Sequence, residues 1–144
     1  MNGNEPQKPT VETSITISSS KDELPFSEIS ELLNKEPSDV RTFHHLTSWG
    51  TMPAIRSSDW TYTMSEVELN AVGEGICELF SAFDTDWAAV GKLCSDRGYE
   101  IIVVSLVKIY DWDDRPLLEL DKKAVKALSL VGAGWRADID DYSR

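Results

Sequence analysis

The sequence predicts a single α+β domain, in which helices pack on a mixed or mainly antiparallel β-sheet of about five to six strands. Three observations lead to this expectation. The 144 residues are enough to bury one hydrophobic core. Segments with the two-residue period of strands alternate with three segments of helical periodicity. At least one connection between predicted strands is too short for a helical crossover, which disfavours a doubly wound parallel sheet.

The segment from Tyr99 to Tyr110 is expected to form the central strand, because it is almost unbroken apolar sequence rich in β-branched residues. A run that is apolar on both faces predicts burial on both sides of the sheet. We expect Ile102, Val104 and Leu106 to line the face against the helices. After a turn, residues 117–120 are expected to re-enter the sheet as a further strand.

Residues 1–10 lack apolar periodicity and are expected to be a disordered lead-in, so that the domain itself spans residues 11–144. Residues 11–18 alternate apolar with polar side chains, which predicts a half-buried strand. A short helix follows with Pro25 in its first turn, and it ends near Asn34. Its apolar face is formed by Phe26, Ile29, Leu32 and Leu33.

The middle of the chain predicts a brief strand at residues 39–45, a long loop at residues 46–58 and a strand from Trp60 to Met64. The sequence Ser65-Glu66-Val67-Glu68 fits a capping box, so a helix is expected to begin directly after that strand. Helical spacing continues to Gly98 with a break at residues 84–86. This pattern predicts one long kinked helix or two helices in succession.

The C-terminal part predicts a third helix and a last strand. Asp121 is expected to cap the helix, and Gly132 to end it. The apolar face of the helix is formed by Ala124, Val125, Leu128 and Val131. In the last strand, Trp135, Ala137 and Ile139 alternate with charged residues. Residues 141–144 are expected to form a frayed end.

The chain has 25 acidic and 14 basic residues and a formal net charge of -11. This charge repels phosphate backbones and anionic lipid, so we expect neither a nucleic-acid nor a membrane partner, whereas a basic protein partner is allowed. The sequence has neither a bilayer-spanning stretch nor a secretory signal, which predicts a cytoplasmic location. Cys77 and Cys94 fall on apolar positions of predicted helices, and we expect both to be unpaired.

No motif in the sequence supports a catalytic or cofactor site. His44 and His45 are neighbours on an extended chain, so they are expected to point to opposite faces. The segment 132–137 satisfies a relaxed dinucleotide-binding pattern, but it opens a strand instead of a helix. The segment 111–114 begins like a calcium loop, yet the glycine and glutamate of such a loop are missing. We therefore expect no enzyme activity, no cofactor and no bound metal.

Acidic segments that contain an aromatic residue are the candidate binding surface, because an indole can anchor a contact while carboxylates steer a basic partner. The predicted partner-binding residues are Asp111, Trp112, Asp113, Asp114, Asp138, Asp140, Asp141 and Tyr142. An alternative site is a small-molecule pocket between the sheet and the loop at residues 46–58. Its apolar walls are expected to come from Trp49, Trp60 and Tyr62.

Several turns and core positions carry a family resemblance. They are Leu24 to Ile29, Leu33 with Glu36-Pro37, Asp59 to Tyr62, Arg97 to Tyr99, and Leu117 to Asp121. These segments resemble a bacterial family catalogued as a domain of unknown function, numbered four-two-seven-nine, from about Glu12 to Asp140. The resemblance implies a compact α+β domain of bacterial origin. Small acidic domains of this size are often similar to immunity proteins encoded beside secreted or contact-delivered toxins.

These observations lead to the hypothesis of an immunity protein, a non-catalytic inhibitor that binds and neutralises a cognate basic toxin such as a nuclease. The missing catalytic motifs, the negative charge and the aromatic residues in acidic segments agree with it. The rival hypothesis is a small-molecule-binding or regulatory domain that uses the aromatic pocket. A hydrolase or transferase that uses His44 or His45 ranks last.

Overall fold

The computed structural model describes the chain over residues 7–46 and 53–143, and for residues 44–46 and 53–56 it describes the backbone alone. The chain forms β-strands and α-helices, and a short 3-10 helix, η1, follows the fourth strand. In chain order the elements are β1 (Thr10–Ser19), α1 (Phe26–Leu33), β2 (Asp39–Leu46), β3 (Pro53–Thr63), α2 (Val72–Ser81), α3 (Trp87–Arg97), β4 (Glu100–Ile109), η1 (Trp112–Asp114), α4 (Lys122–Val131) and β5 (Gly134–Asp141).

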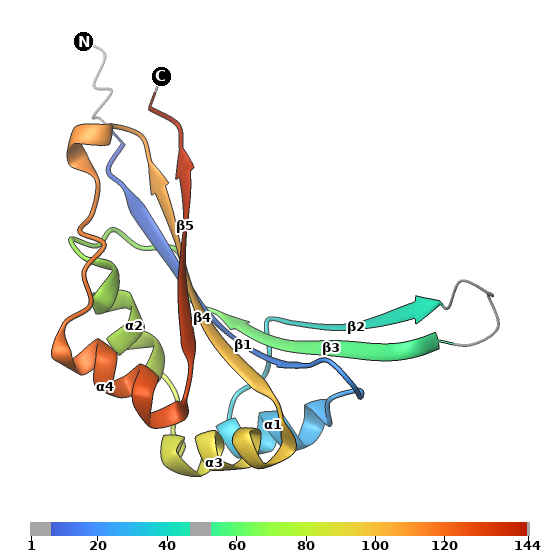
Figure 1. Cartoon of the computed structure of the whole chain (residues 1–144). Helices are drawn as coiled ribbons and strands as arrows, with labels where there is room; N and C mark the ends of the chain where they lie inside the picture. Colours follow the sequence, from blue (N-terminus) through green and yellow to red (C-terminus); the bar gives the residue numbers. More distant parts are fainter. Residues whose placement is uncertain (1–6, 47–52, 144) are drawn as a thin grey trace.

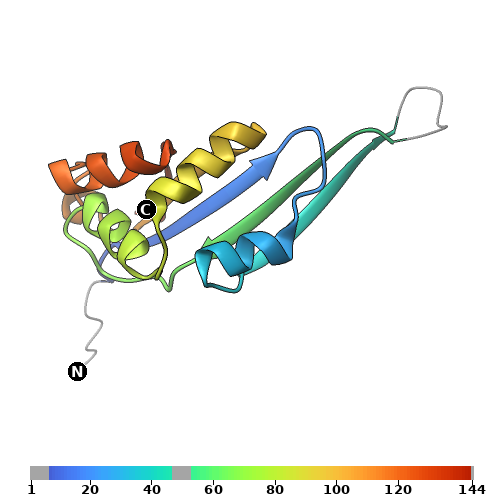
Figure 2. The same cartoon turned by 90° about the horizontal axis from the view of Figure 1, so that it is seen from below.

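Within the described residues the sheet has five strands in the order β2-β3-β1-β4-β5. Neighbouring strands run antiparallel except β4 and β5, which are parallel because α4 returns the chain along the sheet between them. Helices α1 to α4 lie on one side of the sheet, and the paired strands β2 and β3 extend beyond them (Figure 1, Figure 2). The prediction of one α+β domain with a mixed sheet is confirmed.

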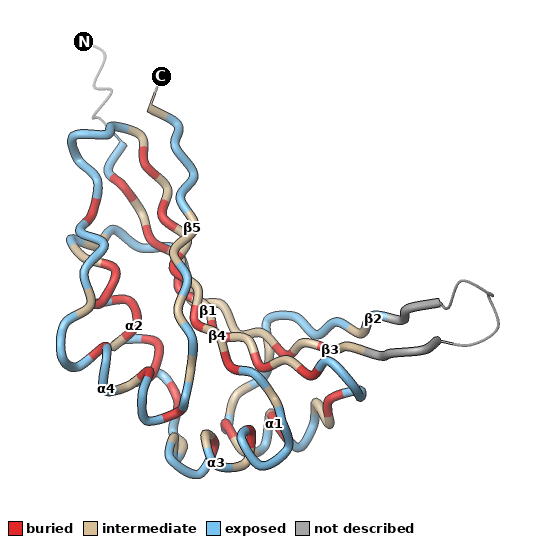
Figure 3. Tube along the Cα trace, in the orientation of Figure 1, coloured by how far each residue is buried: buried red, intermediate tan, exposed pale blue. Residues whose placement is uncertain are grey.

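The hydrophobic core lies between the sheet and the helices. In β1 and β4 every second residue is buried, as Figure 3 shows, and these residues share the side that faces the helices. Their apolar members form two clusters. The larger cluster joins them to residues from each helix, among them Ile29 of α1, Ile76 of α2, Val90 of α3 and Leu128 of α4. The smaller cluster contains Val11, Val107 and Ile109 with Val72 at the start of α2. The alternation predicted for β1 therefore corresponds to one buried and one open face.

The predicted orientation of β4 is wrong. The residues of β4 that face the helices are Ile101, Val103, Ser105, Val107 and Ile109, all of them buried. Ile102, Val104 and Leu106 lie on the opposite face and are half-buried. The central position in the sheet belongs to β1, and β4 lies beside it. The apolar residues of β4 suggested burial on both sides, but no described helix covers the second face.

The predicted capping box at residues 65–68 does not start a helix. Instead, Val67 pairs with Val11, its N–H donating to the Val11 carbonyl at 3.1 Å and its carbonyl accepting from the Val11 N–H at 2.8 Å. Glu66 accepts hydrogen bonds from Thr10 and Lys108. These contacts with β1 and β4 keep the segment extended until α2 begins at Val72. Of the two helical alternatives, the one with two successive helices is correct.

Residues 117–120 do not form the predicted strand of the sheet. Leu117 makes one isolated backbone bridge with Ala71, and the Glu119 carbonyl accepts a hydrogen bond from the Gly73 N–H at 3.2 Å. A Cβ atom at Gly73 would lie 2.8 Å from that carbonyl oxygen, so the approach requires glycine. The segment therefore packs against the start of α2.

The predicted loop at residues 46–58 is shorter than expected, because β3 already begins at Pro53 and pairs with β2. Trp49 lies outside the described residues, as do residues 1–6 of the predicted lead-in. Thr10, which was assigned to the lead-in, is the first residue of β1. Strand pairing outweighs the local loop signals at both places, since β3 pairs with β2 and β1, and Thr10 pairs with Lys108 of β4.

The predicted ends of α1 and α4 are confirmed. Asn34 adopts a left-handed conformation with φ of 52° and ends α1. The Asp121 carboxylate accepts a hydrogen bond from the Ala124 N–H and caps α4, which Gly132 ends with φ of 71°. Val125, predicted on the apolar face of α4, is 50% exposed and does not contribute to the core.

A pair of substitutions in β4 tests the orientation of its two faces. Val103 is fully buried, so Val103→Asp leaves an unpaired carboxylate in the core and is expected to cost several kcal/mol of a total of roughly 5–15 kcal/mol. Val104→Asp on the open face is expected to cost about 1–2 kcal/mol. Urea unfolding followed by circular dichroism measures both values. Equal losses, or a larger loss for Val104→Asp, would contradict the orientation described above.

Candidate functional site

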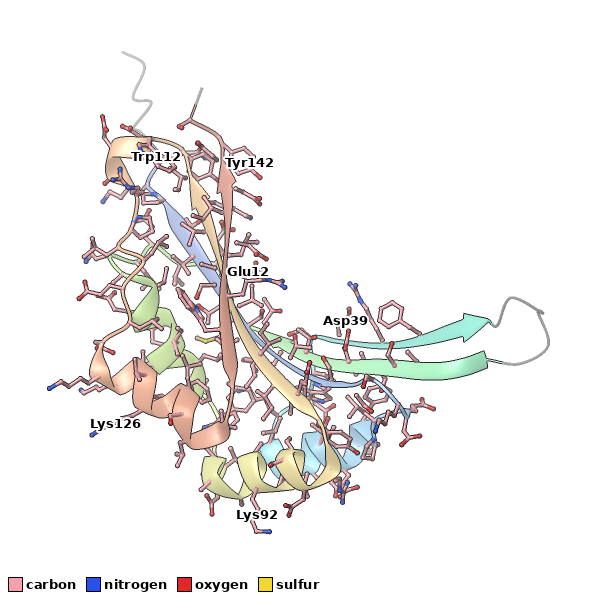
Figure 4. All side chains as sticks on the ribbon, viewed as in Figure 1. Glu12, Asp39, Lys92, Trp112, Lys126 and Tyr142 are labelled. Atoms are coloured by element: carbon pink, nitrogen blue, oxygen red, sulfur yellow. The ribbon has the colours of Figure 1, made fainter. Side chains whose placement is uncertain are left out.

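The acidic turn after β4 and the end of β5 lie side by side. Ile109 of β4 is opposite Asp141 of β5, and the Tyr142 N–H donates to the Ile109 carbonyl at 2.7 Å. The rings of Tyr110 and Tyr142 stack with their centroids 5.4 Å apart and their planes 17° apart. Figure 4 shows Trp112 and Tyr142 at the same end of the molecule. Two segments that are distant in sequence thus form one surface.

Hydrogen bonds hold the turn at residues 111–114, which we call the acidic tip. The Asp111 carboxylate accepts from the Asp113 N–H at 3.0 Å, and the Asp111 carbonyl accepts from the Asp114 N–H at 3.0 Å. The Arg115 guanidinium donates to the Trp112 carbonyl at 2.9 Å and lies 5.0 Å from the centre of the indole ring. Arg115 therefore fixes the turn and balances part of its negative charge.

A groove of about 450 Å³ lies beside the acidic tip, on the side of the sheet that carries the helices. We call it the apolar groove, and its apolar lining is Val107, Ile109, Trp112, Leu117, Leu118 and Ile139. Four large side chains of this lining are unusually exposed. Leu117 is 60%, Leu118 51%, Trp112 48% and Ile139 43% exposed. Contiguous exposed apolar residues with a polar rim are typical of an interaction site.

The structure gathers some of the predicted partner-binding residues and separates others. Asp111 to Asp114, Asp141 and Tyr142 lie at the end of β4 and β5 where the apolar groove is found. Asp138 and Asp140 are opposite Leu106 and Lys108 and therefore lie on the other face of the sheet. Asp138 is also paired with Arg136 at 3.0 Å. The eight residues thus do not form one continuous surface.

Leu117 and Leu118 were not predicted as site residues, because they were assigned to a strand. Ile139 was predicted only as one of the alternating apolar residues of the last strand. The signal that could have found them is the pair of leucines directly after an acidic turn, in a segment too short to be a buried strand.

Of the predicted walls of the small-molecule pocket, Trp49 lies outside the described residues, and the structure places Trp60 in the core. Trp60 is fully buried, and its indole N–H donates to the Ser30 hydroxyl at 3.0 Å, so it has no surface to offer a ligand. Tyr62 is half-buried against Phe83, with ring centroids 5.0 Å apart, and its ring lies 5.2 Å from the Lys35 amino group. Trp60 therefore belongs to the core under α1.

The cysteines are poor nucleophiles in this fold. Burial raises the pKa of Cys94 to about 11. Burial, together with the nearby Asp121 carboxylate, also raises the pKa of Cys77, which is half-buried. The thiolate form is disfavoured at neutral pH for both residues. Among the side chains that the structure describes, those of residues 7–43 and 57–143, no cluster of cysteine and acidic residues has the composition of a metal site.

Comparison with known families gives a match over most of the chain. A family model described as a domain of unknown function (DUF4279) matches residues 9–142, which is nearly the whole chain. No curated protein and no solved structure matches the chain. In the described part of the chain, no helix is long and apolar enough to cross a membrane.

The reactivity of the cysteines tests their burial. The thiol of Cys94 is expected to react with a disulfide reagent at about pH 8 only after unfolding, because it is buried and neutral. Its folded pKa lies above the ordinary value of 9.0, so its contribution to stability is complete below that pH and is lost as the pH rises towards about 11. The measurement uses the Cys77→Ser variant, in which Cys94 supplies the reacting thiol. A rapid reaction of Cys94 in the folded protein would contradict its burial.

A comparison of two tryptophans tests whether the lining of the apolar groove is structural. Trp60→Ala is expected to lose about 3–5 kcal/mol of stability, because it empties a filled core position. Trp112→Ala is expected to lose less than about 1 kcal/mol, because the indole is half-exposed and contacts Arg115. Chemical unfolding measures both losses. A large loss for Trp112→Ala would mean that the indole supports the fold.

Proposed function

The chain belongs to the DUF4279 family of domains of unknown function, as its sequence resemblance predicted, and we propose that this member is an immunity protein. It acts without catalysis, as an inhibitor that binds a cognate basic bacterial toxin and blocks it. The proposed contact surface is the apolar groove together with the acidic tip.

The observation that supports this proposal is the combination of exposed apolar side chains with a polar rim. Trp112, Leu117, Leu118 and Ile139 expose large apolar areas, and Asp113 of the acidic tip and Arg115 border the groove that they line. Protein interfaces typically combine an apolar centre, often with an aromatic anchor, and a polar rim. In the proposed complex the indole and the leucines supply most of the affinity, while the carboxylates supply orientation.

The rigidity of this surface also favours protein binding. The acidic tip follows β4 directly and is held by the Asp111 hydrogen bond, by Arg115 and by the adjacent Tyr110–Tyr142 stack. A surface that is already ordered loses little conformational entropy on binding. With a net charge of -11, the protein also attracts a basic partner over long range and speeds their encounter.

The rival role, small-molecule binding, has support from the size of the apolar groove. Its volume of about 450 Å³ falls within the range of ligand sites. Binding of an uncharged ligand there would depend on Trp112 and Leu118 and would change little with salt. The salt dependence of binding therefore separates the two roles.

The carboxylates of the acidic tip are expected to control the rate of association. The binding partner for this test is the cognate toxin domain, which the proposal expects to be encoded in a reading frame beside that of this protein. Replacing Asp111, Asp113 and Asp114 with Asn is expected to lower the association rate about tenfold at low salt and to flatten its salt dependence. Surface plasmon resonance at several salt concentrations measures both effects.

A matched control separates local from total charge. Glu23, Glu31 and Glu78 are exposed and lie away from the acidic tip, and their replacement by Gln removes the same number of charges. This control is expected to change association much less. If both triple variants behave alike, the acidic tip is not part of the contact surface.

Trp112 is expected to control the rate of dissociation. Trp112→Ala is expected to weaken the complex by about 1–4 kcal/mol, mainly through faster dissociation, because the indole becomes buried on binding. The matched control is Val125→Ala on the exposed side of α4, which should leave binding unchanged. Growth of cells that express the toxin reports protection. Full protection by the Trp112 variant, with unchanged dissociation, would contradict the proposed contact surface.

A further inference from the structure

Strand β5 lies at the edge of the sheet, and no described segment pairs with its outer side. The Tyr142 N–H points towards β4, where it meets the Ile109 carbonyl. Because backbone groups alternate in direction along a strand, the N–H and carbonyl groups of Trp135, Ala137 and Ile139 point away from β4. The outer side of β5 therefore presents a row of hydrogen-bonding groups that a further strand could pair with.

We propose that β5 pairs with β5 of a second copy of this chain in antiparallel orientation. The two copies are related by a twofold axis that passes midway between their Ala137 residues. The pairing joins the two sheets into one continuous sheet with the helices of both copies on the same side. This inference shares Ile139 with the apolar groove, but it rests on the free edge of residues 134–140 and not on the acidic tip, so its failure would leave the proposed toxin binding untouched.

The register follows from the side chains of β5. With Ala137 opposite itself, Trp135 lies opposite Ile139 of the second copy, and Arg136 lies opposite Asp138 of the second copy. Symmetry repeats each pair. The apolar pairs fall on the side of the helices, and the ion pairs fall on the open face, since Arg136 and Asp138 occupy the face of Val104 and Leu106. Apolar and oppositely charged pairs across antiparallel strands are both stabilising.

The symmetric registers centred on residues 136, 138 and 139 bring like charges together. Residues that lie directly opposite each other in paired strands point to the same face of the sheet. If the helices of both copies are to share one side, the twofold axis must therefore pass midway between the two copies of the same residue. An axis at Arg136 places the two Arg136 side chains opposite each other, and an axis at Asp138 places the two Asp138 carboxylates opposite each other. An axis at Ile139 places Asp138 opposite Asp140. The register centred on Ala137 matches charge with opposite charge and apolar with apolar.

The contacts of β5 within one copy suit this role. The Trp135 indole N–H donates to the Ser105 hydroxyl at 3.0 Å, so the ring has a fixed position near the edge. Ile139 remains 43% exposed beside it. Charged residues on an edge strand commonly prevent pairing, but here their signs are complementary in the proposed register. Since one edge strand gives a small interface, we expect a dissociation constant of about 10–500 µM.

Charge reversal tests the pairing. Sedimentation velocity of the full chain from about 5 µM to about 1 mM is expected to show a monomer–dimer equilibrium. Arg136→Asp places two carboxylates opposite each other in both symmetry-related pairs, and Asp138→Arg places two guanidinium groups there. Each variant should weaken the dimer about tenfold or more. The double swap of both residues restores opposite charges and should restore the dimer. Monomers throughout the wild-type series, or a dimer that ignores the reversals, would overturn the proposal.

A disulfide tests the register directly and does not depend on the charge variants. Ala137→Cys places two thiols opposite each other, at the Cα separation of about 5.5 Å that a disulfide spans. Ile139→Cys is the control, because its two copies would be separated by several residues along the strands. Both variants carry Cys77→Ser, and Cys94 is buried. Selective oxidation of Ala137→Cys to a covalent dimer supports the register, whereas equal or absent cross-linking of the two variants overturns it.

Discussion

Strands β1 and β4 have helices against one side and, in the described part of the chain, none against the other. This one-sided burial explains why every second residue of both strands is buried. It also brings helices close to the strands: a Cβ atom at Gly75 of α2 would lie 2.5 Å from the Thr13 hydroxyl oxygen of β1. The buried Ser105 is compatible with this core because it accepts a hydrogen bond from the Trp135 indole.

The candidate site depends on a second constraint, the parallel pairing of β4 and β5. Parallel neighbours end at the same edge of a sheet, so the residues after β4 meet the residues at the end of β5. The path from η1 to α4 then exposes Leu117 and Leu118, because Leu117 is tied to the start of α2 through its backbone bridge with Ala71. The apolar groove is thus a consequence of topology that no single segment of the sequence encodes.

Local signals were sufficient where a residue's own chemistry decides the structure. The alternation of β1, the left-handed Asn34 and the Asp121 cap could all be predicted in this way. Sequence reasoning failed where distant backbone contacts decide, as at Val67, which pairs with Val11, and at Pro53, which begins a strand instead of continuing a loop.

The same difference applies to the candidate site. The acidic tip with Trp112 was recognisable from residue types alone. The position of Asp138 and the exposure of Leu117 depend on strand register and on which face carries helices, and neither can be read from a short segment. Trp60 and Trp112 have similar acidic neighbours in sequence, yet one is buried and the other exposed.

The place of β1 in the sheet has a consequence for biosynthesis. β1 is made first, yet its two neighbours are β3 and β4, and Thr10 finally lies opposite Lys108. A ribosome that releases the chain from its N-terminus therefore exposes the middle strand of the sheet long before either neighbour has emerged. Contacts between such distant residues slow folding, and an unpaired apolar strand is prone to aggregate in the meantime. Shielding β1 until β4 has been synthesised would therefore favour folding over aggregation.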